Sequence, residues 1–112
     1  SALQGVPGAA DLPGPDRLSG AAAKDAAALG DVVGDYVARC FYSKAWQLRE
    51  AALLKMEIDM ATYDASGSAV VTAILGVLQH CATRERIAQV YMTSARLASP
   101  MLEHYGADVR PA

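Results

Sequence analysis

The sequence predicts an all-α protein in which antiparallel helical hairpins stack on one another. Apolar residues recur three and four positions apart through most of the chain, which is the period of an amphipathic helix. Short clusters of glycine, serine, proline and aspartate separate these apolar stretches and indicate turns. The apolar pattern also repeats along the chain, which indicates stacked helical hairpins.

The bulk composition allows one modest domain. The chain has 112 residues, a net charge of −2, and 53% hydrophobic but only 6% aromatic residues, so aliphatic and small side chains must fill its core. Cys40 and Cys81 fall on apolar helical stripes and are expected to be buried free thiols. We see no signal peptide, and no apolar run reaches the roughly 18 residues of a membrane span. We therefore expect a cytoplasmic protein with no nucleic-acid and no membrane partner.

The first 20 residues differ in composition from the rest, because prolines and glycines are frequent among them. Such a segment has too few apolar side chains to order itself. We expect residues 1–20 to form a flexible linker or arm laid over the domain, and residues 21–112 to form the helical repeats. An alanine-rich stretch that starts after Ser19 favours an early helix, and Ser19 and Asp31 are the candidate N-caps between which the sequence leaves the choice open.

Two helices are expected in the first half of the chain. The first spans about residues 29–41, with an apolar stripe of Leu29, Val32, Val33, Tyr36, Val37, Cys40 and Phe41. The second spans about residues 46–60. Its inward stripe is expected to hold Ala51, Leu54, Ile58 and Ala61, widened by Leu48, Ala52 and Met56.

Three more helices follow a turn cluster at residues 62–67. The third, at about 68–82, is apolar nearly all round, as is typical of a helix covered on most sides. The fourth spans about residues 84–98, with apolar or small residues at Ile87, Val90, Tyr91, Ser94, Leu97 and Ala98. Pro100 suits the first turn of a short fifth helix that ends near Tyr105.

The first and third helices share one pattern, and so do the second and fourth. A shift of 41 residues places Val33, Val37 and Cys40 on Ile74, Leu78 and Cys81. A shift of 37 residues places Arg49, Leu53 and Leu54 on Arg86, Val90 and Tyr91. This spacing is near the repeat length of about 40–47 residues in HEAT arrays, whose hairpins bury their apolar faces against the next hairpin. The sequence thus predicts about two HEAT-like repeats and the start of a third.

The single tryptophan, Trp46, lies where a turn enters the second helix. Tryptophan often dominates binding hot spots, so Trp46 and the neighbouring Lys44 are candidate partner anchors. The alternatives are packing of Trp46 within its own hairpin and a solvated Lys44. Arg84 and Arg86 are expected in the turn of the second hairpin, beside the Trp46 turn. Arg49, one turn into the second helix, is expected to pair with a carboxylate or to extend along the hairpin.

The chain resembles TOG domains in the run Ser43-Lys44-Ala45-Trp46-Gln47-Leu48-Arg49-Glu50-Ala51-Ala52-Leu53. The pattern of that family at this point is tryptophan, two residues, arginine and then an alanine–leucine helix. TOG domains are flat arrays of HEAT repeats that bind tubulin through the turns within each repeat. The likeness covers about residues 29–105, the N-terminal part of such a domain. Gln47 stands where many tubulin polymerases have lysine.

The resemblance implies that tubulin or microtubules are the partner, and that Lys44, Trp46, Arg84 and Arg86 bind it. Arg49 is implied as a structural or additional contact residue. Within the family, the run is most similar to that of centrosomal and ciliary-tip proteins. This implies a place in the cytoplasm and cytoskeleton, at the tip of a cilium or flagellum or at a centriole or basal body, with other ciliary-tip or centriolar proteins as further partners.

Residues suited to catalysis are few. His80 and His104 have no cysteine, carboxylate or second histidine at metal-ligand spacing, and His80 is expected to interact with the dipole of a helix end. Asp59 and Asp64 lack the further ligands of a calcium loop. We predict no enzymatic activity, no catalytic residues, no metal and no cofactor. The rival hypothesis is a helical scaffold segment that docks into a larger ciliary or cytoskeletal assembly through its apolar faces.

Overall fold

The computed structural model describes residues 2–109, and all of their regular secondary structure is helical. The prediction of an all-α fold is therefore confirmed. The elements follow in the order η1 (Ala9–Asp11), α1 (Gly20–Val33), α2 (Asp35–Phe41), α3 (Trp46–Asp59), α4 (Gly67–Arg84), α5 (Ala88–Ala95), α6 (Ala98–Tyr105) and η2 (Gly106–Asp108).

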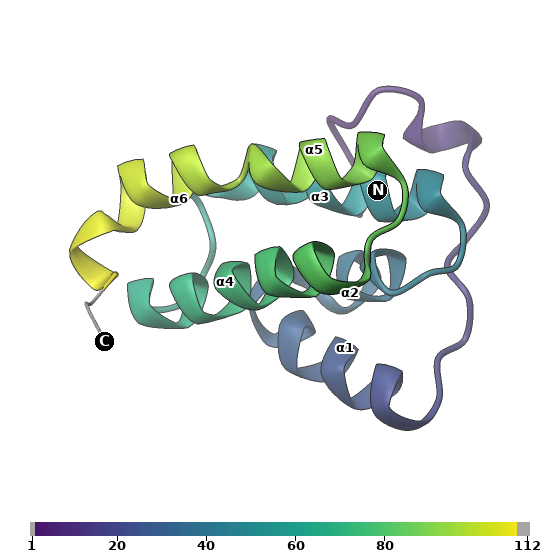
Figure 1. Ribbon diagram of the computed structural model, residues 1–112, viewed down its shortest axis with the longest axis horizontal. Helices are drawn as coiled ribbons and strands as arrows, with labels where there is room; N and C mark the ends of the chain where they lie inside the picture. Colours follow the sequence, from purple (N-terminus) through teal and green to yellow (C-terminus); the bar gives the residue numbers. More distant parts are fainter. Residues whose placement is uncertain (1, 110–112) are drawn as a thin grey trace.

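The helices form two hairpins, with α1 as an addition on one side. Helices α2 and α3 form the first hairpin, and α4 with α5 and α6 forms the second. Figure 1 shows α3, α5 and α6 along the upper side of the molecule and α1, α2 and α4 along the lower side. Helix α3 of the first hairpin contacts α5 of the second, so the two hairpins lie side by side as in a repeat array. The additional helix α1 contacts α4.

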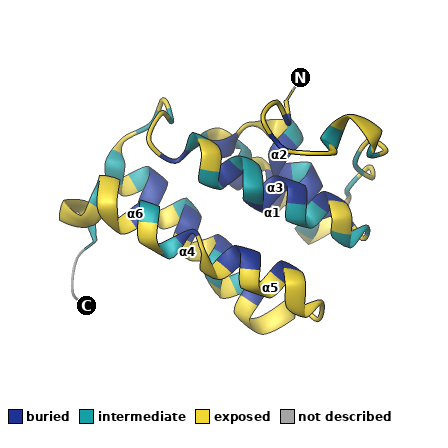
Figure 2. Ribbon diagram, turned by 90° about the horizontal axis from the view of Figure 1, so that it is seen from above, coloured by how far each residue is buried: buried dark blue, intermediate teal, exposed yellow. Residues whose placement is uncertain are grey.

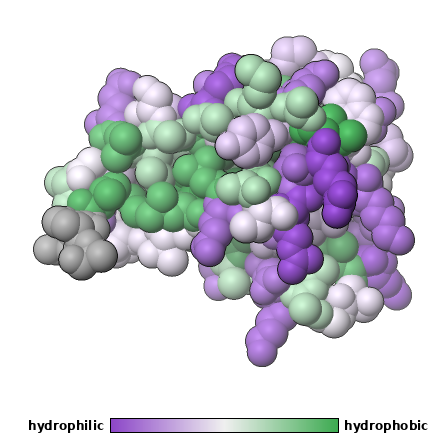
Figure 3. Space-filling model, in the orientation of Figure 1, coloured by the Kyte–Doolittle hydropathy of each residue, from purple (hydrophilic) through white to green (hydrophobic). Residues whose placement is uncertain are grey.

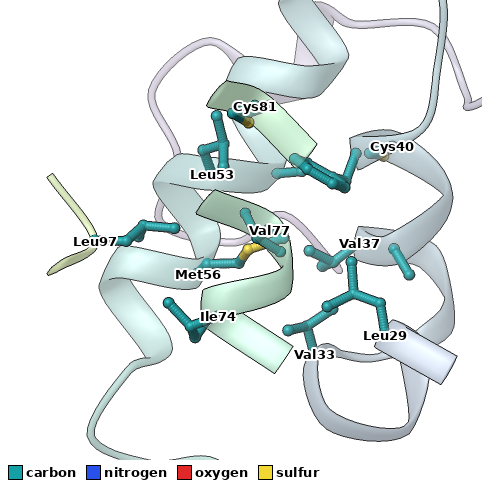
Figure 4. Packing of buried hydrophobic residues seen from close by; sticks show 14 of the residues in the cluster. Leu29, Val33, Val37, Cys40, Leu53, Met56, Ile74, Val77, Cys81 and Leu97 are labelled. Carbon is teal, nitrogen blue, oxygen red and sulfur yellow. The ribbon is translucent and has the colours of Figure 1, made fainter. Parts of the chain in front are cut away.

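The core lies between these two hairpins. Its largest fully buried side chains include Phe41 from α2, Leu48, Leu53 and Met56 from α3, Ile74 from α4, and Met60 and Leu97 from the segments that follow α3 and α5. In Figure 4, Met56 lies beside Val77, and Leu53 lies close to Cys81. Cys40 and Cys81 are buried and free, as predicted. Figure 2 shows that the outer faces of α5 and α6 are mostly exposed.

The expected first helix at residues 29–41 is wrong in its bounds, because the chain forms two helices there. Helix α1 begins at Gly20 after the N-cap Ser19, and the chain bends at Gly34 before α2. Gly34 has φ 94° and ψ 148°, a conformation that almost only glycine adopts. The apolar stripe still points inward on both helices, with Leu29, Val33 and Val37 buried.

The expected inward stripe of α3 is wrong at its C-terminal half. Ile58 is 50% exposed and Ala61 is exposed, whereas the stripe through Leu48 and Met56 is buried. The side of α3 that carries Ile58 faces the N-terminal arm instead. The Lys55 ammonium donates a hydrogen bond of 3.0 Å to the Gln4 carbonyl oxygen.

The N-terminal arm contributes two side chains to the core. Leu3 is 4% exposed and Val6 is 8% exposed, and both belong to the main apolar cluster. The composition of the arm, which is rich in proline and glycine, did not lead us to expect buried side chains in it.

The second hairpin departs from its predicted bounds at its turn. Helix α4 continues to Arg84, and α5 begins only at Ala88, so the connecting turn is residues 85–87. Arg84 therefore ends a helix, and of the two predicted arginines only Arg86 lies in the turn. The predicted short last helix is present as α6, with Pro100 in its first turn.

Candidate functional site: the edge formed by two turns

The two turns within the hairpins lie at the same end of the molecule. Residues 42–45 connect α2 to α3, and residues 85–87 connect α4 to α5. Figure 1 shows both connections at one end, while the link from α3 to α4 lies toward the other end. We call the exposed rim at this end the turn edge, and define it by Lys44, Trp46, Arg84 and Arg86.

Arg49 joins the two turns. Its Nε donates to Oε1 of Glu85 at 2.8 Å, and its Nη2 donates to Oε2 at 2.9 Å. Its Nη1 donates to the carbonyl oxygens of Ser43, at 3.1 Å, and Lys44, at 2.8 Å. One guanidinium therefore connects α3, the first turn and the second turn. Of the two arrangements that we expected for Arg49, the structure shows the pairing with a carboxylate.

The carboxylate of Glu85 completes this connection. Its Oε2 also accepts hydrogen bonds from the backbone N–H groups of Arg86 and Ile87, each at 3.0 Å, where α5 is about to begin. The hydrogen bond from Arg49 lowers the pKa of Glu85 below its ordinary value, and the same bond raises the pKa of Arg49. Both charges are thus held in their ionised forms, and the pair adds no net charge to the turn edge.

Three cations of the turn edge stay unpaired. Lys44, Arg84 and Arg86 are exposed, and none of them forms an ion pair with another residue of the range 2–109. One acidic residue of the arm lies beside the first turn, where Asp16 accepts hydrogen bonds from the Ser43 hydroxyl at 3.5 Å and from the Lys44 backbone N–H at 3.4 Å. The turn edge therefore carries excess positive charge on a chain whose net charge is −2.

Trp46 begins α3 and is half-buried. Its side chain packs against the main apolar cluster, so one part of the indole supports the hairpin and the rest reaches the surface. The sequence offered a partner anchor and hairpin packing as alternatives for Trp46. The geometry leaves part of the side chain accessible for contact beside the exposed Lys44.

A shallow cleft of about 340 Å³ lies between the two turns. Arginines 49, 84 and 86 line it together with Tyr42 and His80. The His80 ring lies 5.0 Å from the Tyr42 ring and 5.3 Å from the Phe41 ring, measured between centroids, so His80 belongs to an aromatic cluster. Burial, and then the charge of Arg84, lower the pKa of His80. Our expectation for His80, an interaction with a helix end, missed this cluster.

Glu85 and Asp16 belong to the site but were not predicted from the sequence. Glu85 lies 36 residues from Arg49, and Asp16 lies 27 residues from Ser43, so no helical spacing relates either pair. The sequence contains one hint that Glu85 belongs to the site, namely its position between Arg84 and Arg86.

Within residues 2–109, no three His, Cys, Asp or Glu side chains come close enough together to hold a metal ion. Over the same residues, none of the helices combines the length and the apolar character needed to cross a membrane.

Comparison with protein-family models, curated protein sequences and solved structures finds no match to this chain.

Proposed function

We propose that this chain is a non-enzymatic module that binds tubulin or microtubules through its turn edge. The observation that carries the proposal is the Arg49–Glu85 connection, because it brings the turn with Lys44 and Trp46 beside the turn with Arg86. A half-buried indole beside unpaired cations has the composition of a protein-binding hot spot. Tubulin is acidic, so it complements this positive rim.

The resemblance to TOG domains directs the choice of partner. It also supports a place at a ciliary or flagellar tip, a centriole or a basal body, where other ciliary-tip or centriolar proteins would be neighbours. The fold suits this function, since stacked hairpins present their turns along one edge.

Trp46→Ala tests the proposal in a co-sedimentation assay with taxol-stabilised microtubules and in a binding assay with free tubulin. We expect an approximately 30-fold loss of affinity, which corresponds to a hot spot of about 2 kcal/mol. Because the indole also packs on the core, circular dichroism and urea unfolding must show that the variant is folded. Unchanged binding by a folded variant would refute the anchor role of Trp46.

A double variant tests the cations without disturbing the core. Arg84→Gln with Arg86→Gln should weaken tubulin binding, because two unpaired charges leave the turn edge. The matched control is Arg96→Gln, since Arg96 is also exposed but lies at the other end of α5. Equal affinities of the double variant and the control would contradict a role for the turn edge.

The second candidate function is that of a scaffold segment that docks through an apolar face. Leu75, Tyr91, Met92 and Leu102 on α4, α5 and α6 are 45–68% exposed. In Figure 3, apolar surface gathers over α4 and α6, and hydrophilic surface gathers where α4 gives way to α5. Salt separates the two functions: binding through the turn edge should weaken between 20 and 150 mM salt, roughly the range over which the Debye length falls from about 20 to 8 Å, whereas apolar docking should hardly change.

A further inference from the structure

An open groove runs between α1 and α4, on a part of the surface for which the sequence predicted no site. Its volume is about 530 Å³, larger than that of the cleft at the turn edge. Leu29 and Val77 form buried parts of its lining, and Val32 is half-buried there. In Figure 1, α1 lies below α4. The groove exists because the chain bends at Gly34 and turns α1 out of the line of α2.

The α4 wall of the groove consists of small side chains. Ser68, Ala69, Thr72, Ala73 and Gly76 line it in successive turns of the helix. A Cβ atom added at Gly76 would meet no atom of residues 2–109 within 4 Å, so no side chain in this range occupies the space above Gly76. Packed helices approach to an axis separation of about 8–10 Å, and small side chains at the contact favour the shorter distance. This wall therefore has room for the side chains of another helix.

The α1 wall carries two exposed carboxylates, Asp25 and Asp31. Neither forms an ion pair or hydrogen bond with another described residue, and no lysine or arginine lines the groove. Six residues of helix separate them by about 9 Å along the axis. Other titratable groups on this side are Tyr42, which borders the groove, and His80, which feels the charge of Asp25. The rim of the groove is thus negative above an apolar floor.

We propose that the α1–α4 groove binds an amphipathic helix of a protein partner, with aliphatic residues on one face and lysine or arginine beside that face. The aliphatic face would cover Leu29, Val32 and Val77, and the cations would pair with Asp25 and Asp31. This is the helix-in-groove mode of recognition, here with an acidic rim that selects for positive charge. The groove shares Tyr42 with the cleft between the two turns, but none of the four residues that define the turn edge lines it, so each proposal can be refuted without the other.

The first test uses two synthetic 18-residue probes labelled with fluorescein. Both have leucine and alanine on one helical face, and the residues beside this face are lysine in one probe and glutamate in the other. Titration of the 112-residue protein in 50 mM salt, followed by fluorescence anisotropy, should give a micromolar Kd for the lysine probe and at least tenfold weaker binding for the glutamate probe. Equal binding of both probes, or no binding of the lysine probe at 1 mM protein, would overturn the proposal.

Variants then locate the binding site. Gly76→Leu places a large side chain on the groove wall. Its Cβ meets no described atom within 4 Å, and leucine favours a helix more than glycine does, so the fold should persist. We expect it to weaken binding of the lysine probe at least tenfold. Asp25→Asn with Asp31→Asn should weaken binding three- to tenfold and reduce its dependence on salt.

The control variant is Arg84→Gln with Arg86→Gln, which alters the turn edge and should leave binding of the lysine probe unchanged. The alternative occupant of the groove is a second copy of the chain, which sedimentation velocity would detect as a dimer. If the protein forms dimers and Gly76→Leu dissociates them, the proposal of a partner helix is wrong. It is also wrong if the Gly76→Leu variant binds the lysine probe as tightly as the wild-type protein does.

Discussion

Arg49 and Glu85 are joined by two parallel hydrogen bonds of 2.8 and 2.9 Å, although 36 residues separate them in the chain. Their side chains are only 20% and 5% exposed. A two-point contact between a guanidinium and a carboxylate fixes orientation as well as distance. The pair thus sets how the first hairpin lies against the second at the end that carries the turn edge.

Arg49→Gln should lower the free energy of unfolding by about 2–3 kcal/mol, because it leaves the Glu85 carboxylate and two turn carbonyls without their charged donor. Urea unfolding followed by circular dichroism measures the change. Arg96→Gln is the matched control: the Arg96–Glu57 ion pair is formed by an arginine whose side chain is 59% exposed, so its loss should cost at most about 1 kcal/mol. Equal destabilisation by the two variants would contradict a special role for Arg49.

Acid should weaken the same connection. Arg49 lowers the pKa of Glu85 below its ordinary value of 4.5, so between the two pKa values the unfolded chain binds more protons than the folded one. Stability from Glu85 is therefore fully present above about pH 5 and is lost as the pH falls through the folded pKa. The difference in unfolding free energy between the unchanged protein and Glu85→Gln should be constant from pH 7 to 5 and should shrink toward pH 3. A difference that stays constant down to pH 3 would contradict this account.

Local periodicity predicted the helices that pack in a regular way. The bounds of α3 agree closely with the sequence prediction, and the stripe that includes Leu29, Val33 and Val37 is buried. These features depend on side chains three and four residues apart, so a single helix contains the whole signal. The adjacency of the two turns was also predictable, because it follows from the similar lengths of the repeats.

Contacts between distant segments were not predictable in this way. Ile58 fits the apolar period of α3, but the arm packs near it and the core lies on another side. Glu85 finds Arg49 only when the hairpins stack. The bend at Gly34 was hidden because the apolar stripe continues through it, so the residues before and after the bend read as one helix. The α1–α4 groove depends on this bend, so the groove could not be inferred from a sequence pattern that hides the bend.

Gly34→Ala tests how firmly the bend is set. At φ 94° and ψ 148° an alanine is strained, so the substitution should lower the free energy of unfolding by about 1–3 kcal/mol. The strain arises in the backbone alone, since a Cβ at Gly34 would meet no atom within 4 Å. Urea unfolding measures the loss, and binding of the lysine probe reports whether the groove keeps its shape.

Gly76→Ala is the matched control for this prediction, because a Cβ there also meets no atom within 4 Å but Gly76 lies inside α4 without a positive φ. Alanine is the better helix former, so Gly76→Ala should raise the free energy of unfolding by about 0.5–1 kcal/mol. We thus expect the same added methyl group to lower the free energy of unfolding at Gly34 and to raise it at Gly76. If Gly34→Ala also stabilised the protein, residues 29–41 would be able to form the continuous helix that their apolar stripe favours. The α1–α4 groove would then be one of two accessible arrangements, and a partner helix would have to select it.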